Sequence, residues 1–357
     1  MTDGSSSSST GLRVVVSGAT GNVGTSVVEA LGRDPAIGSV LGLARRVPEW
    51  SAPKTTWAAA DICEADLTAH FDGADAVVHL AWRFGPTHDP VVTWRTNVLG
   101  SIRVFRAAAA AGVPALVHAS SVGAYSPGPE GHPKDQAVNE SWPTHGWPDA
   151  AYCREKAYLE RVLDGFEHEH PGLRVVRMRP AFIFKREAAA EQSRIFAGFV
   201  PPRTAVSPKL LPRVPDLPGL RVQVLHASDA ADAYRRAVLR PVRGAFNLAA
   251  EPPVDAHLLA ELLGVRSVHL PVGPPRALLA AAWHLRAVPA SPHLFDAVLR
   301  LPLLDTTRAR EELGWSPART AEETVRELLA GLRTQEGLPT PPLHPPRRRW
   351  RAGSAAA

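Results

Sequence analysis

A tyrosine and a lysine stand four positions apart in the segment AAYCREKAYLERVL, residues 150–163. The segment has a helical pattern, and residues i and i+4 of a helix share a face, so Tyr152 and Lys156 would be neighbours. An ammonium group near a phenol stabilises the phenolate and lowers the tyrosine pKa from about 10 towards neutrality. The pair is therefore a candidate general acid/base centre. The alternative is that two unrelated side chains merely share a helical face.

Hydroxyl groups precede this pair in the segment HASSVGAYS, residues 118–126, which continues an apolar strand pattern. Ligands of parallel α/β sheets bind at the carboxyl ends of strands, where Ser120 and Ser121 would lie. Serines at a strand end also cap the backbone, so this pattern alone gives them no chemical role. Together with Tyr152 and Lys156, they favour a site that acts on a hydroxyl or carbonyl oxygen.

A glycine-rich turn stands near the start of the chain in SGATGNVG, residues 17–24, with Gly18, Gly21 and Gly24 at three-residue spacing. It separates an apolar strand pattern from a helical pattern. One glycine permits a tight turn, one lets the backbone approach a pyrophosphate, and one lets the helix pack on the strand. The helix N-terminus attracts the phosphates. This position favours a dinucleotide-binding turn over an ordinary glycine-rich loop.

The second strand pattern ends in GLARR, residues 42–46, and bears on the choice of cofactor. An acid here would hydrogen-bond the adenosine ribose of NAD. Arg45 and Arg46 stand here instead, and a guanidinium can bind a 2′-phosphate through two hydrogen bonds, so the sequence favours NADP and leaves NAD possible. The alternative is that both arginines are solvated. Asp61, at the end of the third strand pattern, could accept from the adenine amino group or simply begin a turn.

Strand and helix patterns alternate through the first half of the chain, which is typical of a parallel sheet. Because the glycine turn and the serines follow strands, one edge of the sheet would hold the site. The sequence predicts an α/β fold with a Rossmann-type doubly wound parallel sheet. Strands are expected at 12–18, 39–46, 55–62, 74–82, 115–121 and 173–180, and helices at 22–34, 91–112 and from 150 onwards.

The pattern becomes irregular after Pro180, and residues 186–221 are rich in Pro and Arg with little periodicity. Helical pieces that stop at glycine and proline follow, which indicates a small C-terminal substrate-binding domain. The expected parts are a disordered leader (1–10), an NAD(P)-binding Rossmann domain (11–180, with 222–250 returning to it), a substrate-binding part (181–221 and 251–335) and a disordered Pro/Arg-rich tail (336–357).

Composition narrows the class of protein. Of the 357 residues, 45% are hydrophobic and 21% are charged, as in ordinary globular proteins. No apolar stretch approaches the ~20 residues of a membrane span, and the first residues do not resemble a secretory signal. Cys63 and Cys153 are too few for a disulfide framework or a metal cluster. We therefore expect a cytoplasmic protein that binds neither a membrane nor a metal.

The formal net charge of +5 comes mostly from the C-terminal tail, which carries Arg347, Arg348, Arg349 and Arg351. Without these four arginines, 36 basic residues stand against 35 acidic residues. Nucleic-acid binding depends on basic residues gathered on one surface. Since the basicity belongs to a short terminal segment, a nucleic-acid partner is disfavoured.

In their order along the chain, these motifs resemble the extended short-chain dehydrogenase/reductase superfamily, in its NAD-dependent epimerase/dehydratase-like branch. The resemblance covers about residues 11–320. Each motif alone is weak, but their shared order is highly specific. It implies an NAD(P)-dependent enzyme for a small-molecule substrate, and a homodimer paired through helices near 91–112 and 151–168. The motifs are SGATGNVG, DI (61–62), VVHLAW, NVLGS, HASSVGAYS, YCREK, RPAF, HASDAADAYRRA and LGWSP.

The resemblance also implies roles for single residues. Tyr152 is the general acid/base, and Lys156 holds the nicotinamide ribose and lowers the pKa of Tyr152. Ser121 hydrogen-bonds the substrate carbonyl, Ser120 is structural, and Asn97 supports the site or a proton relay. The expected cofactor-binding residues are Gly18, Thr20, Gly21, Asn22, Val23, Gly24, Arg45, Arg46, Asp61, Ile62, Leu80, Ala81, Trp82, Tyr152, Lys156 and Pro180.

Departures from the family pattern bear on the substrate. Val122 and Gly123 stand where sugar-nucleotide dehydratases carry acids, and Ser126 and Lys185 stand near positions where glycine is usual. These changes disfavour dehydration and weaken the case for epimerisation. The leading interpretation is an oxidoreductase that transfers a hydride between NADP(H) and a carbonyl/hydroxyl substrate. The alternatives are a sugar-nucleotide epimerase with a retained cofactor and a non-catalytic NAD(P)-binding regulatory or assembly protein.

Overall fold

The structure is a computed structural model that describes residues 11–85, 87–128, 136–197 and 212–345. The predicted leader lies outside the described residues. The main body is a seven-stranded parallel sheet in the order β10-β6-β5-β4-β1-β2-β3. Its strands are β1 (Leu12–Ser17), β2 (Ile37–Ala44), β3 (Thr55–Ala59), β4 (Ala76–His79), β5 (Ala115–Ala119), β6 (Arg174–Pro180) and β10 (Gly244–Leu248).

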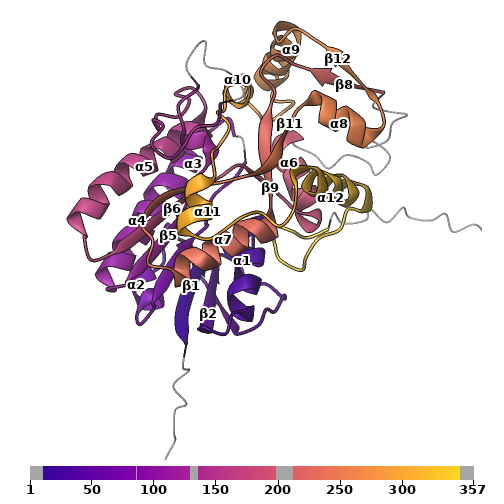
Figure 1. The fold of residues 1–357 in the computed structure, drawn as a ribbon. Coiled ribbons are helices and arrows are strands. Elements are labelled where there is room, and N and C mark those ends of the chain that lie inside the picture. Colours follow the sequence, from indigo (N-terminus) through magenta and orange to yellow (C-terminus); the bar gives the residue numbers. More distant parts are fainter. Residues whose placement is uncertain (1–10, 86, 129–135, 198–211, 346–357) are drawn as a thin grey trace, which may run out of the picture.

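Helices cover both faces of this sheet, because alternate side chains of each strand point to opposite faces. In β1, Val14 and Val16 belong to one fully buried cluster with residues of α1 and α7. Val15 belongs to the opposite cluster, with residues of α4 and α5. The predicted doubly wound Rossmann-type sheet is thus confirmed (Figure 1). These helices are α1 (Asn22–Arg33), α2 (Leu67–Phe71), α4 (Gly100–Ala110), α5 (Ala151–Glu169), α7 (Ala227–Leu239) and α11 (Thr307–Glu312).

The C-terminal part lies over the carboxyl edge of the sheet, at the top of Figure 1. Of the segment 222–250 that was expected to return to the Rossmann domain, α7 packs on α1 and β10 pairs with β6. The strand β9 instead pairs with β7 and β11, because Val224 packs in an apolar cluster of the C-terminal part. The other elements are β7 (Phe182–Phe184), η3 (Arg186–Ala188), α6 (Ala189–Ala197), β8 (Arg213–Asp216), β9 (Val222–His226), β11 (Ala250–Val254), α8 (Ala256–Leu263), β12 (Arg266–His269), α9 (Gly273–His284), α10 (Pro292–Val298) and α12 (Ala321–Thr334).

The helix predicted over 91–112 is interrupted in the structure. It consists of α3 (Pro90–Thr93), a π-helical turn η1 (Trp94–Leu99) and α4. The π-helical turn carries Asn97, which is buried, and the Asn97 carbonyl oxygen accepts a hydrogen bond from the Ser101 hydroxyl. Single π-turns inside helices often mark functional positions.

The predicted disorder of the C-terminal tail is wrong for residues 336–345. Thr340 and Leu343 are buried, and the Leu338 N–H donates to the Leu343 carbonyl at 3.0 Å. Arg194 donates to the Pro342 carbonyl, also at 3.0 Å. The leucine gives this Pro-rich segment an apolar side chain to bury, so it packs against the body. The basic residues beyond 345 lie outside the described part.

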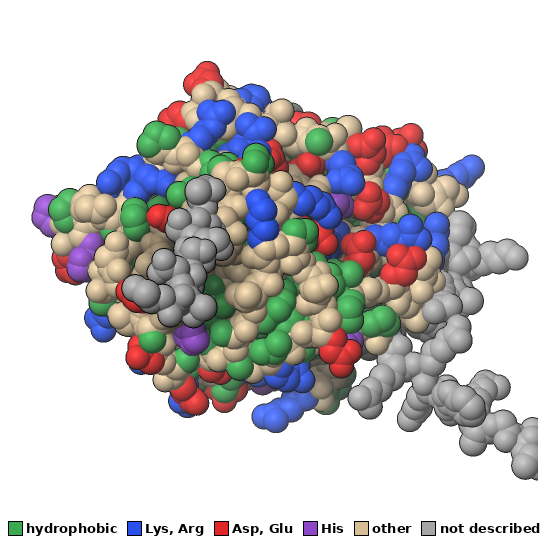
Figure 2. All heavy atoms as spheres, turned by 90° about the horizontal axis from the view of Figure 1, so that it is seen from below, with side chains coloured by type: hydrophobic (Ala, Val, Ile, Leu, Met, Phe, Trp, Pro, Cys, Tyr) green, Lys and Arg blue, Asp and Glu red, His purple; other side chains and the backbone are tan. Residues whose placement is uncertain are grey.

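The surface seen from below carries basic and acidic side chains interspersed with one another (Figure 2). Within the described ranges, none of the helices is both long enough and apolar enough to span a membrane. In those same ranges, no group of three or more His, Cys, Asp and Glu side chains is placed to hold a metal ion.

Candidate active site

The glycine-rich turn joins β1 to α1 through close backbone contacts. Gly18 has a φ of +74°, and a Cβ there would lie 2.5 Å from the Ala81 nitrogen. A Cβ at Gly24 would lie 2.2 Å from the Gly18 carbonyl oxygen. Among the described residues no side chain caps α1, whose N-cap is Gly21, so its first amides can bind an anion. The turn therefore fits a dinucleotide pyrophosphate.

Asn22 adds a polar atom at the start of α1. Its Nδ2 donates to the Ile183 carbonyl at 2.9 Å. Its Oδ1 is buried without a hydrogen-bond partner among the described residues, and the residue lines a cleft. A buried acceptor left in this state costs about 1–3 kcal/mol. A hydroxyl group of a bound nucleotide could supply the missing donor, so Asn22 also fits such a cofactor.

This cleft, of about 300 Å³, connects the glycine turn with the predicted catalytic residues. Its walls come from the carboxyl ends of the central strands, from α5 and from the C-terminal part. The sheet edge thus brings together segments that are far apart in the sequence. The predicted site residues that line the cleft are Gly18, Gly21, Asn22, Val23, Gly24, Leu80, Trp82, Asn97, Ser121, Tyr152, Lys156 and Pro180.

The other predicted cofactor residues lie outside the wall of the cleft. Arg45 and Arg46 follow β2 and are exposed. Asp61 behaves as a turn starter, because its Oδ1 accepts the Cys63 N–H at 2.9 Å. The remaining three residues of this group are buried or half-buried behind the wall: Thr20, Ile62 and Ala81.

Lys156 lies buried on the first turns of α5. Its Nζ donates to the Ala119 carbonyl at 2.7 Å and stands 3.4 Å from the centre of the Trp82 ring. Burial lowers the pKa of Lys156 to about 7, although the carboxylates of Glu155 and Glu160 act in the opposite direction. The lysine is therefore a buried base whose proton is held weakly at neutral pH.

Tyr152 lies one helical turn earlier and packs against Gly123. A Cβ at Gly123 would lie 2.8 Å from the Tyr152 Cε1, so a side chain at 123, acidic or otherwise, would displace the tyrosine ring. Burial raises the pKa of Tyr152 above its usual value, and a hydrogen bond with Ser121 acts against this rise. The predicted lowering of this pKa by Lys156 is not found, because the lysine Nζ is bonded to Ala119 and lies 6.0 Å from the tyrosine ring centre.

The two serines after β5 differ in their hydrogen-bond partners. Both line the cleft, and Ser121 accepts the Gly123 N–H through its hydroxyl at 3.0 Å. It therefore also caps a turn, as serines at strand ends commonly do. Ser120 donates to Glu160 Oε1 at 2.5 Å. The chemical role of Ser121 and the structural role of Ser120 stay predictions from the resemblance.

Asn97 is held by a buried carboxylate that the sequence reading did not single out. Its Nδ2 donates to Glu155 Oε2 at 2.8 Å, and its Oδ1 accepts the Arg83 N–H at 2.7 Å. Glu155 Oε1 accepts from the Thr93 hydroxyl at 2.5 Å. Glu155 thus fixes the π-helical turn to α5 beside Tyr152. The signal for it was present, since Glu155 stands inside the motif YCREK itself.

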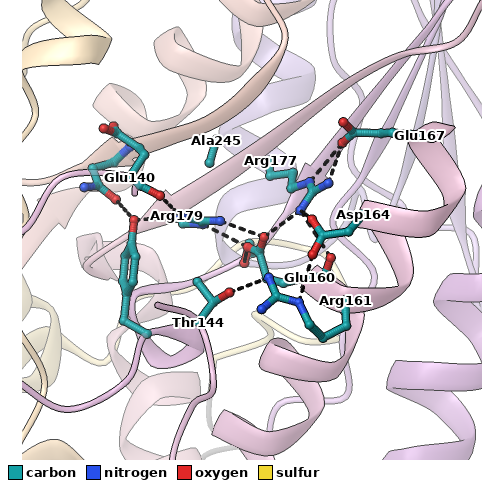
Figure 3. Close-up of polar contacts among 12 residues, drawn as sticks. Glu140, Thr144, Glu160, Arg161, Asp164, Glu167, Arg177, Arg179 and Ala245 are labelled. Atoms are coloured by element: carbon teal, nitrogen blue, oxygen red, sulfur yellow. Dashed lines mark hydrogen bonds and ion pairs between the residues drawn. The ribbon is translucent and has the colours of Figure 1, made fainter. Parts of the chain in front are cut away.

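A second polar network fixes α5 to the sheet one helical turn beyond Lys156 (Figure 3). Glu160 Oε2 accepts hydrogen bonds from Arg179 Nη2 at 2.8 Å and from Arg177 Nη1 at 3.1 Å, and both arginines lie on β6. Burial would raise the pKa of Glu160, but the two guanidinium groups hold it at about 2. These contacts set the position of α5 and therefore of Tyr152 and Lys156. Arg177 also pairs with Asp164 and Glu167.

Beyond the catalytic pair, the cleft is lined by residues that sequence reasoning missed. Phe84 packs against Tyr152 with ring centres 4.9 Å apart. Trp283, from α9, stacks on His88 with ring centres 3.5 Å apart. Glu191, from α6, also lines the cleft. No local pattern joins these positions, because their proximity depends on how the C-terminal part folds over the sheet.

The doubly wound sheet, the glycine turn and the cleft at the carboxyl edge define a Rossmann-type dinucleotide-binding protein. The model of the NAD dependent epimerase/dehydratase family matches residues 14–249, and the chain belongs to this family. The superfamily expected from the motifs is therefore confirmed.

Curated relatives carry several functions. An uncharacterized protein of Mycobacterium tuberculosis is 28% identical over 334 residues, which are 92% of this chain and 31% of that protein. The chain thus spans about a third of the length of that relative. The UDP-glucose 4-epimerase of Mycolicibacterium smegmatis is 28% identical, covering 91% of this chain and 99% of its own. The 3-diazoavenalumate denitrifying reductase of a Streptomyces species is 29% identical, covering 86% and 96%.

Solved structures agree on the fold. The crystal structure of gox2253 has a TM-score of 0.71 at 20% identity and covers 90% of this chain and 98% of its own. The UDP-glucose 4-epimerase of Thermus thermophilus, in complex with NAD, has a TM-score of 0.65 at 20% identity and covers 90% and 99%. At this identity, the likeness establishes the architecture and leaves the reaction open.

Proposed function

We propose that this protein is an oxidoreductase that transfers a hydride between NADP(H) and a carbonyl/hydroxyl substrate. The observation that carries the proposal is the meeting of Tyr152, Ser121 and Lys156 in the same cleft as the glycine turn. The bound nicotinamide supplies or accepts the hydride. Ser121 orients the substrate oxygen, Tyr152 donates a proton to it in reduction or removes one in oxidation, and Lys156 holds positive charge beside the reacting centre.

The preference for NADP rests on Arg45 and Arg46. Both follow β2 and are exposed, and no hydrogen bond or ion pair holds either side chain within the described residues. Two unengaged guanidinium groups at this position suit a 2′-phosphate, whereas the acid that would favour NAD is absent.

The experiment follows NADPH absorbance while the purified protein is offered a panel of aldehydes, ketones and alcohols. Substrate-dependent oxidation of NADPH, or reduction of NADP, would support the proposal. Turnover that persists undiminished in the Tyr152→Phe protein would contradict the role of Tyr152. Absence of any nicotinamide binding would exclude the oxidoreductase altogether.

A second candidate function is sugar-nucleotide epimerisation, which the relationship to the Mycolicibacterium smegmatis epimerase favours. An epimerase oxidises and re-reduces its substrate on one cofactor molecule, so it retains that cofactor. Release of bound nicotinamide from denatured protein, together with interconversion of UDP-sugars, would support this alternative. A non-catalytic NAD(P)-binding regulator has less support, because binding alone does not require Ser121, Tyr152 and Lys156 to meet in the cleft.

We further propose a homodimer paired through α3, η1 and α5. Val91, Leu99 and Tyr158 on these elements are 72%, 49% and 44% exposed, which is high for apolar or aromatic side chains. Light scattering at micromolar concentration should give twice the monomer mass, and Leu99→Arg should reduce it to the monomer. A monomeric unmodified protein would contradict this proposal.

A further inference from the structure

The cleft extends past Tyr152 into a hollow, here named the substrate chamber. Phe84 packs on Tyr152 at its entrance, and α9 and α10 close it from the C-terminal part. Ala297 of α10 packs with Cys153 in one buried cluster, which places this helix beside the catalytic turn of α5. The chamber is lined mainly by apolar and aromatic side chains: Phe84, Val122, Trp283, Leu294, Val298 and Leu301.

Cations are scarce in the walls of the chamber. Of the described residues that line the cleft, Arg83 and Lys156 carry positive charge. Arg83 is exposed, and Lys156 is already bonded to the Ala119 carbonyl. Proteins usually bind a diphosphate with clustered Arg or Lys side chains or with a helix N-terminus. Among the described residues, the chamber therefore lacks the clustered Arg or Lys side chains that would hold the diphosphate of a sugar nucleotide.

A carboxyl group stands in the wall instead. Glu191 on α6 lines the cleft, and its Oε2 is buried without a hydrogen-bond partner among the described residues. Together with Phe84 and Pro289 it also borders a neighbouring hollow, so it lies near the aromatic entrance. Burial raises the pKa of Glu191 to about 7, against the effect of Arg194 and Lys185. A buried acceptor of this kind would repel a phosphate and would gain stability from a hydroxyl donor.

We propose that the substrate chamber binds an uncharged aromatic carbonyl compound, or the corresponding alcohol, that carries a hydroxyl group donating to Glu191. This substrate class rests on the proposed oxidoreductase function. In reduction, the hydride of NADPH adds to the carbonyl carbon and the Tyr152 phenol proton passes to the carbonyl oxygen. The products are the alcohol and NADP, and solvent returns the proton to Tyr152. Phe84 and Trp283 hold the ring by aromatic contact.

The test compares para-hydroxybenzaldehyde, benzaldehyde and UDP-glucose on the full chain. Binding to the NADP-loaded protein is measured by calorimetry, and reduction is measured by NADPH consumption. We expect para-hydroxybenzaldehyde to bind about tenfold or more tightly than benzaldehyde, as one hydrogen bond to a carboxyl group would give. UDP-glucose should bind more weakly than either aldehyde. Tighter binding of UDP-glucose, or no binding of either aldehyde, would overturn the proposal.

Variants isolate the two parts of the chamber. Glu191→Leu should remove the preference for the hydroxylated aldehyde while leaving benzaldehyde affinity within about threefold. Trp283→Ala should weaken both aldehydes about equally. Glu311→Leu, an exposed position on α11, is the matched control and should change neither. A Glu191→Leu protein that keeps the full preference would overturn the assignment of Glu191.

The outcomes also separate this inference from the proposed function. If the aldehydes bind with the expected preference but no nicotinamide is oxidised, the substrate chamber stands and the oxidoreductase proposal fails. If the protein interconverts UDP-sugars on retained nicotinamide and binds neither aldehyde, the chamber proposal fails while nicotinamide chemistry remains.

Discussion

Two stretches of α5 each bury a charged side chain, but they differ in whether that charge has a partner of opposite sign. Near its start, Lys156 lies buried against the Ala119 carbonyl and the Trp82 ring, and burial lowers its pKa to about 7. One turn later, Glu160 faces Arg177 and Arg179. Burial acts to lower the pKa of Arg179, but Glu160 outweighs it and the pKa is raised. The charge of Lys156 is nearly unmatched, which means that it lacks a close partner of opposite charge. The charge of Glu160 is matched by the guanidinium groups of Arg177 and Arg179.

The difference separates positioning from reactivity within a single helix. A matched buried pair is costly to break, so the Glu160 network fixes the helix on the sheet. An unmatched buried cation destabilises the fold, and sites of chemistry are where such groups are retained. The helix therefore presents its reactive residues, Tyr152 and Lys156, to the cleft because the charge pairs one turn further along hold it in place. The following changes test this division, from the largest expected effect to the smallest.

Tyr152→Phe removes one hydroxyl from the reactive residues and should lower turnover by about 10²- to 10⁴-fold, the usual contribution of a general acid/base. Nicotinamide affinity and thermal stability should stay close to those of the unmodified protein. Steady-state kinetics and cofactor titration give both quantities. If Tyr152 were only a packing residue, the phenylalanine protein would keep most of its activity.

Glu160→Gln should destabilise the fold by about 3–5 kcal/mol, because it leaves Arg177 and Arg179 buried without their carboxylate. The folded pKa of Glu160, about 2, lies below the ordinary 4.5, so its contribution is complete above pH 4.5 and is lost as pH falls towards 2. Denaturant unfolding as a function of pH measures this. Glu167→Gln is the matched control, with a carboxylate that is 31% exposed, and it should cost about 1 kcal/mol or less. Equal losses in both variants would contradict the special place of Glu160.

Unlike Glu160→Gln, Lys156→Met should stabilise the fold, by about 1–3 kcal/mol at neutral pH. Turnover and cofactor affinity should fall in this variant. Since burial lowers the pKa of Lys156 from 10.5 to about 7, the unfolded chain binds more protons between these values. The cost of burying this lysine is therefore complete below about pH 7 and fades as pH rises towards 10.5. Unfolding of both proteins over this range should show the gain of the variant shrinking with pH. Arg179→Met, at a matched cation, should be destabilising instead.

The sequence was sufficient for those parts of the site that depend on local pattern. The glycine turn follows from steric limits at Gly18 and Gly24, and Tyr152 and Lys156 share a face because a helix repeats every 3.6 residues. The order of apolar strands predicted the parallel sheet in the same way. Each of these features lies within one strand–turn–helix unit.

The sequence alone did not predict contacts between segments that are far apart along the chain. The pairing of Glu160 with Arg179, and the meeting of Phe84 with α9 and α10, depend on packing across the fold. The expected effect of Lys156 on Tyr152 failed for the same reason, because helical spacing does not determine that the ammonium bonds to Ala119. The π-helical turn at Asn97 also needs tertiary partners, since Glu155 and Thr93 hold it in place.

Arg45 is a cation without a partner, as Lys156 is, but it is exposed to water. The lack of a partner there costs little stability. We expect Arg45→Asp to weaken NADPH binding by about tenfold or more and to leave NADH binding unchanged or tighter, because repulsion replaces attraction at the 2′-phosphate. Fluorescence titration of both cofactors against both proteins measures the change, and its dependence on salt should fall in the variant. Arg33→Asp, at an exposed arginine of α1 that pairs with Glu29, is the matched control and should leave the ratio of the two affinities unaltered. Tighter binding of NADH than of NADPH by the unmodified protein would show that Arg45 is merely solvated. In that case an unmatched charge on this molecule would indicate a ligand only where it is also buried, as at Lys156.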